Sequence, residues 1–301
     1  MVKNSEIPEW LKKAVGKSKA AFYGQSACRT QSALGGLHTV CREARCPNRG
    51  ECFSLGDATI MILGDVCTRG CRFCAVQKAH PPLPPAHDEP AQAARTAREL
   101  GLKYLVLTMP TRDDLPDGGA RHIYNVITAV RAQCPACEVE PLISDLGGKF
   151  EHLPLILSSG CAVLAHNVET VPSLYNAVRV GADYRRSLKL LEEAKKTAPR
   201  VLTKSGIMLG MGESEAELKT VLKDLRAAGC DLLTLGQYLA PSAQHYAVKE
   251  YPEQPYYDML KEFAIDAGFK GVMAGPLVRS SYKAGLLYAQ AAGRFRNSSA
   301  R

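Results

Sequence analysis

Two groups of three closely spaced cysteines lie near the N-terminal end of the chain. Their spacings are C-x4-C-x5-C and C-x3-C-x2-C, and their members are Cys41, Cys46 and Cys52, then Cys67, Cys71 and Cys74. Thiolate sulfur is a soft ligand that suits an iron–sulfur cluster or zinc. A cluster of four irons that is held by three cysteines keeps one iron open for another ligand. The two groups therefore predict two clusters, each with a special fourth position.

Composition limits the classes of protein to which the chain can belong. Of its 301 residues, 46% are hydrophobic and 23% are charged, as is usual for globular proteins in water. No apolar stretch approaches the roughly 20 residues of a membrane-spanning helix, and the N-terminal residues lack the apolar core of a signal peptide. Eleven cysteines then favour metal binding or catalysis over disulfides. We expect a cytoplasmic protein without a membrane partner.

The net charge of +8 comes partly from the two ends of the chain. The basic residues there are Lys3, Lys12, Lys13, Lys17, Lys19, Arg294, Arg296 and Arg301. Two interpretations stay open, because such residues form solvated tails in some proteins and attract an acidic partner in others. Since the chain has no dense block of Lys and Arg with interleaved aromatic residues, we expect no nucleic-acid partner.

Apolar, strand-like segments alternate with amphipathic, helix-like segments from residue 58 onward. The expected strands cover residues 58–64, 103–108, 138–144, 162–166, 202–209, 232–239 and 271–274. The expected helices cover residues 89–100, 120–132, 151–159, 184–197, 214–228 and 256–267. This alternation predicts an α/β fold with a parallel sheet. Because no Gly-x-Gly-x-x-Gly follows a strand, a partial (β/α)6-type TIM barrel is favoured over a dinucleotide-binding fold.

We expect three segments along the chain. Residues 1–57 form an irregular N-terminal extension with the first cysteine group, residues 58–275 form the barrel, and residues 276–301 form a C-terminal segment. Polar residues follow the expected strands at their carboxyl ends, where barrels of this kind carry their chemistry. They are the second cysteine group, the run 112–114, Asp145 and the run 166–169.

The second cysteine group resembles the radical S-adenosylmethionine (SAM) superfamily. The resemblance rests on the C-x3-C-x2-C loop, on the aromatic Phe73 before its last cysteine, and on its place after the first strand. In that superfamily the open iron of a 4Fe–4S cluster binds SAM, and one electron cleaves SAM to a 5′-deoxyadenosyl radical. The resemblance implies that Cys67, Cys71 and Cys74 hold such a cluster. A purely structural metal loop is the alternative.

Together with the first cysteine group, several further motifs resemble one family within that superfamily, the lipoyl synthases. The matching segments are residues 58–65, 67–76, 111–120, 166–171, 203–213, 236–239 and 275–282. They span most of the chain from about residue 38 onward, and the last contains Arg279-Ser-Ser-Tyr282. Taken alone, that tetrapeptide is ordinary loop material.

The family resemblance implies a reaction and a ligand set. Cys41, Cys46 and Cys52 would hold an auxiliary 4Fe–4S cluster whose fourth ligand is Ser281. Lipoyl synthases insert two sulfur atoms from this cluster at carbons six and eight of an octanoyl chain on a carrier lysine, and they use two molecules of SAM. Ser281 and Arg279 are then the expected catalytic residues. A hydroxyl is a poorer iron ligand than a thiolate, which suits a cluster that is dismantled.

The remaining cofactor contacts are expected at the strand ends. By analogy, Phe73, Thr108, Asn167 and Glu169 contact SAM, and Arg179 is the candidate for its carboxylate. Hydrogen bonding at the barrel rim is the alternative for each residue. On the fifth barrel strand, Lys204 is expected either to pair with an acid or to face the substrate channel.

The resemblance also implies partners. The substrate would be an octanoylated lipoyl carrier domain or a glycine-cleavage H-type protein, and the electron donor a ferredoxin or flavodoxin. We expect a monomer in which the two extensions meet and close the barrel mouth. Two other functions stay open: another radical SAM enzyme with an auxiliary cluster, and a non-catalytic iron–sulfur protein.

Five cysteines lie outside the two groups. Cys28 stands apart upstream. Cys134 and Cys137 form a C-x2-C pair that we expect at the bottom of the barrel, away from the chemistry, with a structural role. Cys161 and Cys230 precede strands and are expected to be buried apolar residues.

Overall fold

The computed structural model describes residues 7–20, 25–35, 37–43, 46–54, 59–79 and 82–293. Several residues singled out in the sequence lie outside this part, so the predictions that concern them stay predictions. They are Lys3, residue 58 at the expected start of the first strand, and the basic residues Arg294, Arg296 and Arg301.

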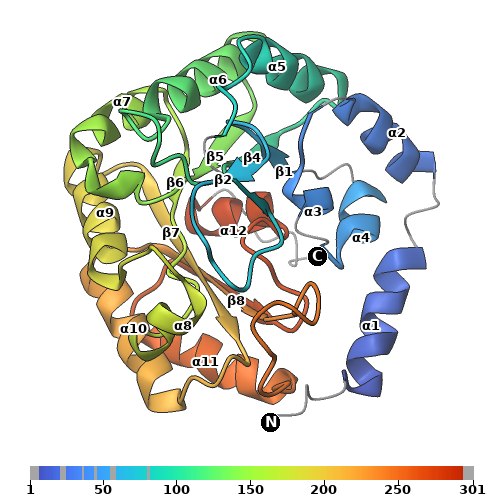
Figure 1. Cartoon of the computed structure of the whole chain (residues 1–301), viewed down its shortest axis with the longest axis vertical. Helices are drawn as coiled ribbons and strands as arrows, with labels where there is room; N and C mark the ends of the chain where they lie inside the picture. The colour runs from blue at the N-terminus through green and yellow to red at the C-terminus, as the bar shows by residue number, and fades with distance from the viewer. Residues whose placement is uncertain are drawn as a thin grey trace, which may run out of the picture.

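A seven-stranded parallel sheet forms the centre of the molecule (Figure 1). Its strands follow one another in chain order: β1 (Thr59–Met61), β4 (Tyr104–Thr108), β5 (Glu138–Leu142), β6 (Val163–Ala165), β7 (Leu202–Leu209), β8 (Leu232–Gln237) and β9 (Gly271–Gly275). The residues of β8 are all buried, as expected for a parallel strand that is covered on both faces. A second, two-stranded parallel sheet pairs β2 (Val66–Cys67) with β3 (Gln77–Lys78).

Helices connect the strands and lie around the sheet, and six of them follow the predicted helical segments (Figure 1). They are α5 (Glu89–Glu99), α6 (Ala120–Gln133), α7 (Leu153–Ser158), α9 (Tyr184–Thr197), α10 (Glu215–Ala227) and α11 (Gln254–Asp266). Side-chain caps explain why two of them begin where they do. Asp183 accepts a hydrogen bond from the N–H of Arg186 at the start of α9, and Ser214 and Glu217 form a capping box on α10.

The predicted fold class is confirmed. Six strand–helix units and a final strand build the sheet, whose strands β1 and β9 form its two edges. In the part of the chain that the structure describes, no ladder joins these two edges, so the barrel is partial. Each expected strand is present, and α9 begins and ends at the predicted residues.

The N-terminal region is helical, so the prediction of an irregular extension was wrong. It contains α1 (Glu9–Ala20), α2 (Gln25–Leu34), α3 (Val40–Glu43) and α4 (Arg49–Ser54). Short polar helices carry little periodic signal, and tertiary packing stabilises them. Here Leu11, Leu34 and Phe53 are buried, and α4 packs on both α1 and α2. In Figure 1 these helices stand beside the open side of the sheet, and α3 contacts β1.

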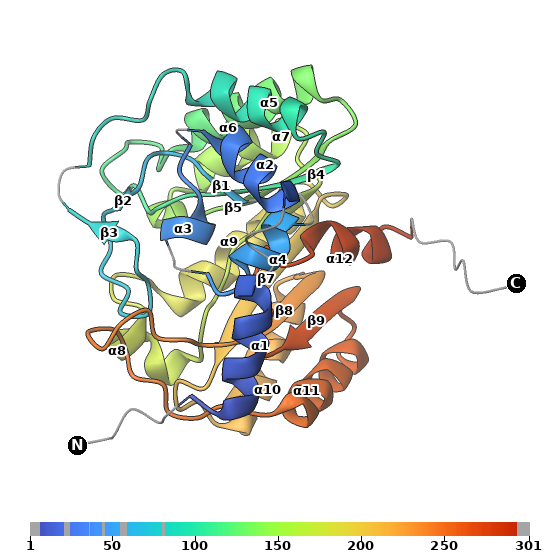
Figure 2. The ribbon, with the colours of Figure 1, turned by 90° about the vertical axis from the view of Figure 1, so that its right-hand side faces the viewer.

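The C-terminal segment divides into two parts. Residues 276–283 run from β9 along the interior of the barrel, and α12 (Ala284–Ala291) follows. Figure 2 shows α12 at the side away from β2 and β3, and it packs on β4, β8 and β9. There Leu287 is buried and Tyr288 Oη donates to Glu138 at the start of β5 (3.2 Å). The expectation that this extension closes the mouth therefore applies to residues before α12, since α12 covers the opposite end.

Candidate functional site

A cavity of about 510 Å³ lies at the carboxyl ends of the strands. Residues from both expected cluster groups line it together with the C-terminal motif. These lining residues are Cys41, Cys46, Cys67, Cys71, Cys74, Arg279, Ser280 and Ser281. The sixth cysteine, Cys52, is outside the lining and stands on α4, where its backbone N–H donates to the Asn48 carbonyl (2.9 Å).

The second cysteine group forms a loop that begins at the end of β2. Cys67 Sγ accepts hydrogen bonds from the backbone N–H groups of Arg69 (3.4 Å) and Thr111 (3.3 Å). Burial raises the pKa of the Cys71 thiol and raises that of Cys74 to about 11. Metal binding at these sulfurs therefore releases protons.

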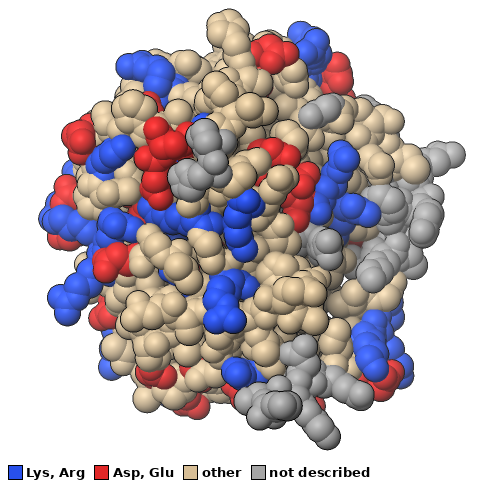
Figure 3. Space-filling view, viewed as in Figure 1, with Lys and Arg blue, Asp and Glu red and all other residues tan. Residues whose placement is uncertain are grey.

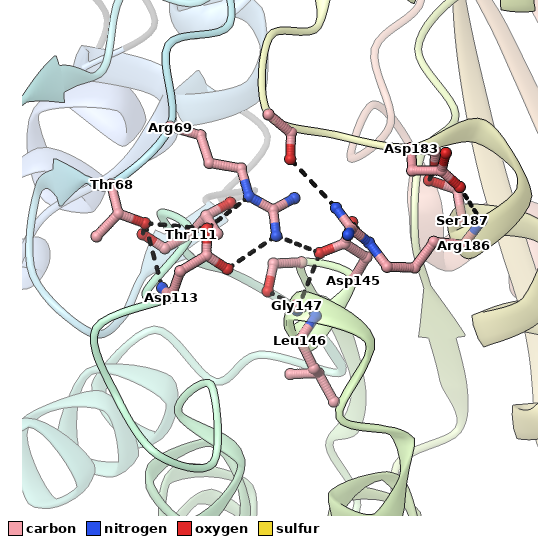
Figure 4. A network of polar contacts seen from close by, with 12 residues as sticks. Thr68, Arg69, Thr111, Asp113, Asp145, Leu146, Gly147, Asp183, Arg186 and Ser187 are labelled. Atoms are coloured by element: carbon pink, nitrogen blue, oxygen red, sulfur yellow. Dashed lines mark hydrogen bonds and ion pairs between the residues drawn. The ribbon is translucent and has the colours of Figure 1, made fainter.

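A network of charged side chains holds this loop to the neighbouring strands (Figure 4). Arg69 donates to Asp113 through Nε (2.7 Å) and Nη2 (2.8 Å), and through Nη2 to Asp145 (2.5 Å). Arg186 at the start of α9 donates to the other oxygen of Asp145 (2.6 Å). Burial alone would raise the pKa of Asp145, but the charge and hydrogen bonds of Arg69 outweigh it and hold this pKa well below its usual range. The loop is thus fixed by groups that stay charged.

The first cysteine group lies on and between two N-terminal helices, with Cys41 on α3, Cys52 on α4 and Cys46 between them. Burial, and then the neighbouring Cys46, raises the pKa of the Cys41 thiol to about 12. The backbone N–H of Cys46 donates to the Cys41 carbonyl (3.2 Å), so the two residues share one turn of chain. No three His, Cys, Asp or Glu side chains among the described residues gather as for a single metal ion. A 4Fe–4S cluster does not require three ligands around one ion, because each of its thiolates binds a different iron.

The C-terminal motif packs against these same helices. Asn48 Nδ2 donates to the Leu277 carbonyl (2.5 Å), and Tyr282 Oη donates to Glu51 on α4 (2.9 Å). Arg279 interacts electrostatically with Cys46, although burial lowers the pKa of this guanidinium. The two extensions therefore meet, as the sequence predicts, and they do so along one wall of the cavity.

The residues expected to contact SAM line the same cavity. Thr108 ends β4, Asn167 and Glu169 follow β6, and Arg179 follows α8 (Tyr175–Val178). Glu169 has a positive φ of 65°, which is uncommon outside glycine, and accepts from Asn167 Nδ2 (3.1 Å). Burial raises the pKa of the Glu169 carboxyl, and the charge of Arg179 opposes that effect. Phe73 lines the cavity too, and packs on a buried cluster that includes Tyr238.

Hydroxyl groups hold Arg179 in place. Its Nη1 donates to Tyr175 Oη (2.8 Å) and to Ser187 Oγ (3.0 Å). The guanidinium is buried, and it keeps its charge because Tyr175 and Glu169 interact with it favourably. A fixed, charged guanidinium at the cavity wall is suited to bind a carboxylate.

Sequence reasoning placed His166 in a motif but not in the site. Burial, and then the charge of Arg179, lowers the pKa of His166 to about 4, so the ring is neutral at pH 7. Its Nδ1 lies 2.9 Å from the Ile143 carbonyl oxygen, which makes Nδ1 the donor and leaves Nε2 as an acceptor. Among the described residues, neither this Nε2 nor Oδ1 of Asn167 has a partner. Both residues line the cavity, so these two acceptors fit a ligand that brings N–H or O–H groups.

Comparison with known proteins decides the family. A family model described as the radical SAM superfamily matches residues 61–225. A lipoyl synthase of Caldicellulosiruptor saccharolyticus is 49% identical over 277 residues, which are 92% of this chain and 95% of that protein. Lipoyl synthases of Trichlorobacter lovleyi (49% identity, 92% and 96% coverage) and Desulfotalea psychrophila (47%, 94% and 93%) agree equally well. The chain belongs to the lipoyl synthase family.

Solved structures of other proteins have the same fold as this lipoyl synthase family member. Methylornithine synthase (PylB) matches with a TM-score of 0.53 and 14% identity over 95% of this chain and 88% of its own. The hydrogenase maturase HydG matches with a TM-score of 0.55 and 13% identity, over 88% and 66% of the two chains. At this level of identity the likeness concerns the fold alone.

In the described residues, no helix of this family member is long and apolar enough to cross a membrane.

The structure also decides between the two expectations for Lys204. Its Nζ lies 2.8 Å from Glu140 on β5, and both side chains are buried. Tyr104 Oη donates to the other oxygen of Glu140 (2.5 Å). Since Lys204 is absent from the cavity lining, it pairs with an acid beneath the cavity and does not face the channel.

The cysteines outside the two groups lie away from the cavity lining. Cys161 and Cys230 are buried, as predicted, and burial raises the pKa of Cys161 to about 11 and that of Cys230 to about 12. The backbone N–H of Cys137 donates to the Cys134 carbonyl (2.9 Å) in the turn before β5, at the opposite end of that strand from the cavity.

Proposed function

We propose that this chain inserts two sulfur atoms, at carbons six and eight, into an octanoyl chain carried on a lysine of a protein. Membership of the lipoyl synthase family supports the reaction class. The observation that carries the proposal is one cavity lined by residues from both cysteine groups, by Ser281 and by the strand-end residues. A single substrate in this cavity reaches both groups.

The proposal assigns the cofactors to this chain as follows. Cys67, Cys71 and Cys74 would hold a 4Fe–4S cluster that binds SAM. Cys41, Cys46, Cys52 and Ser281 would hold an auxiliary 4Fe–4S cluster. When bound, the first cluster and SAM supply the radical that abstracts hydrogen from unactivated carbon, and the second supplies sulfur.

The chain's own residues bind, orient and shield these groups. Arg179 pairs with the SAM carboxylate, while Asn167, Glu169 and Thr108 hold polar groups of SAM and Phe73 packs beside it. The Arg69 network keeps the cysteine loop in position during turnover. Arg279 would place its guanidinium near Cys46, where an auxiliary cluster would bring negative thiolates.

We propose an octanoylated lipoyl carrier domain or a glycine-cleavage H-type protein as substrate, and a ferredoxin or flavodoxin as electron donor. Lys and Arg side chains are spread across the face that Figure 3 shows, and exposed cations of this chain include Arg72, Lys78 and Lys249. Lys78 lines the cavity itself. An acidic carrier docks on such a surface, so charge reversal at these three residues should weaken carrier binding at low salt. Unchanged affinity would remove this docking surface from the proposal.

We also propose that the protein acts as a cytoplasmic monomer made of the segments 1–57, 58–275 and 276–301. An isotope experiment tests the central reaction. Protein reconstituted with 34S-sulfide is given SAM, a reductant and an octanoyl-lysine peptide, and the product is weighed by mass spectrometry. Two 34S atoms in the peptide support the proposal. Cleaved SAM with an unlabelled, unmodified peptide would favour another radical SAM enzyme, and intact SAM would favour a non-catalytic iron–sulfur protein.

A further inference from the structure

The two adjacent serines of the C-terminal motif have different surroundings. Ser280 Oγ accepts a hydrogen bond from Asn167 Nδ2 (2.5 Å), and Asn167 follows β6. The same Nδ2 donates to Glu169 (3.1 Å). Ser280 therefore links the C-terminal segment to residues that we assign to SAM binding. Ser281 also lines the cavity, next to this link in the chain.

Two glycines provide the room for this link. A Cβ atom on Gly206 would lie 2.9 Å from Asn167 Oδ1 and 3.1 Å from Ser280 Oγ. A Cβ atom on Gly236 would lie 2.0 Å from the Val278 carbonyl oxygen. Neither contact is sterically allowed without a shift. The strands β7 and β8 are thus shaped to let residues 278–280 lie directly against them.

On the other side of Ser281, the segment is fixed to the N-terminal helices. Tyr282 Oη donates to Glu51 (2.9 Å), and Lys283 Nζ lies 3.6 Å from the same carboxylate. Glu51 precedes Cys52 in α4. Ser281 therefore lies between two anchors, one on the SAM side of the cavity and one on the helix of the first cysteine group.

We propose that Ser280 is a positioning residue that, through Asn167, holds Ser281 at the auxiliary cluster and couples that ligand to the SAM site. The inference rests on the proposed function for the identity of the two sites. The observation behind it is the hydrogen bond between Asn167 and Ser280, which are 113 positions apart in the chain. A change at Asn167 when SAM binds is transmitted through Ser280 to the one ligand of the auxiliary cluster that is not a thiolate.

A double-mutant cycle on iron release tests the link. The anaerobically reconstituted protein is mixed with an iron chelator, and the rate at which iron leaves is recorded for wild type, Ser280→Ala, Asn167→Ala and the double variant. We expect each single substitution to accelerate release from one cluster about fivefold, the effect of one neutral hydrogen bond. The double variant should release iron no faster than either single variant, because both remove the same bond.

Two further variants serve as controls. Ser280→Thr keeps the hydroxyl and should restore most of the slow release, whereas Ser158→Ala removes an exposed hydroxyl from the surface of α7 and should leave the rate unchanged. In the wild type, SAM should alter the rate of iron release, and Ser280→Ala should abolish that effect. Additive single effects, or a SAM effect that survives in Ser280→Ala, would overturn the proposal. Iron release is measured without product formation, so a chain that made no lipoyl product would refute the proposed function and leave this test intact.

Discussion

Asp145→Asn removes one negative charge from the protein interior and leaves the shape of the side chain almost unchanged. The carboxylate is fully buried and accepts from Arg69 (2.5 Å), Arg186 (2.6 Å) and the backbone N–H of Gly147 (3.1 Å). An asparagine keeps only one acceptor oxygen, and its NH2 group faces a guanidinium donor. Arg69 retains Asp113, but Arg186 loses the only carboxylate with which it forms an ion pair among the described residues.

The expected loss of stability follows from these contacts. Breaking a buried ion pair by removing one partner costs about 3 to 5 kcal/mol. We take about 3 kcal/mol for Asp145→Asn, since the half-exposed Asp113 still compensates Arg69. With a urea dependence of about 3 kcal/mol per molar, the unfolding midpoint should fall by about 1 M.

The assay is urea-induced unfolding of the anaerobically reconstituted protein at pH 7, followed by circular dichroism. Glu193→Gln is the matched control, because it removes an exposed ion pair with Lys189 on the surface of α9 and should leave the midpoint unchanged. Arg69→Lys should lie between wild type and Asp145→Asn, because an ammonium cannot reproduce the paired bonds of the guanidinium. A midpoint shift for Asp145→Asn no larger than that of the control would refute the reasoning.

The pH dependence of the stability difference between wild type and Asp145→Asn has a predicted direction. The folded-state pKa of Asp145 is depressed below its unfolded value of about 3.9, so its contribution to stability is present above that pH and is lost as the pH falls. The difference between wild type and Asp145→Asn should therefore be constant near neutrality and shrink below about pH 4. A difference that grows on acidification would contradict this assignment.

Three further substitutions probe the rest of the site. Ser281→Cys should keep both clusters but slow product formation strongly, because a thiolate leaves iron less readily than a hydroxyl. Iron counting checks that both clusters are present, and mass spectrometry checks the rate of product formation. Undiminished turnover would contradict the ligand assignment. Lys204→Met leaves Glu140 buried without its cation and should lower the free energy of unfolding, measured in urea, by about 3 kcal/mol. The double variant that also carries Glu140→Gln should recover much of that stability. Equal losses of stability in the single and double variants would contradict the pairing. His166 has a folded-state pKa of about 4, below its unfolded value of 6.5, so protonation favours the unfolded chain and stability falls from pH 6.5 toward pH 4. His166→Gln should lack this part of the acid sensitivity in the same unfolding assay, and an unchanged pH profile would show that His166 is not buried in the neutral form.

The strands and outer helices of the barrel were predictable because their hydrophobic pattern is local. Asp183 and Ser214, for example, mark the starts of α9 and α10 by residue type alone. The N-terminal helices gave no such signal. Phe53 on α4 is fully buried only because distant segments pack around it, and no local pattern reports that burial.

The candidate site was predictable where spacing carries the information, as in the two cysteine groups. Contacts between distant segments were not predictable. The bond between Ser280 and Asn167 joins residues 113 positions apart, and the space at Gly206 exists only after β7 lies beside both. The sequence places His166 at a strand end. That its Nε2 has no hydrogen-bond partner among the described residues follows only from the positions of the neighbouring donors in the fold.

Counting iron and sulfide in the reconstituted wild type and in a variant that replaces Cys41, Cys46 and Cys52 by alanine tests the central claim most directly. The account predicts about eight irons in the wild type and about four in the variant. With an octanoyl-lysine peptide, the wild type should form the two-sulfur product, while the variant should still cleave SAM without transferring sulfur. Four irons or fewer in the wild type, with SAM left intact, would contradict the account of two clusters in one cavity.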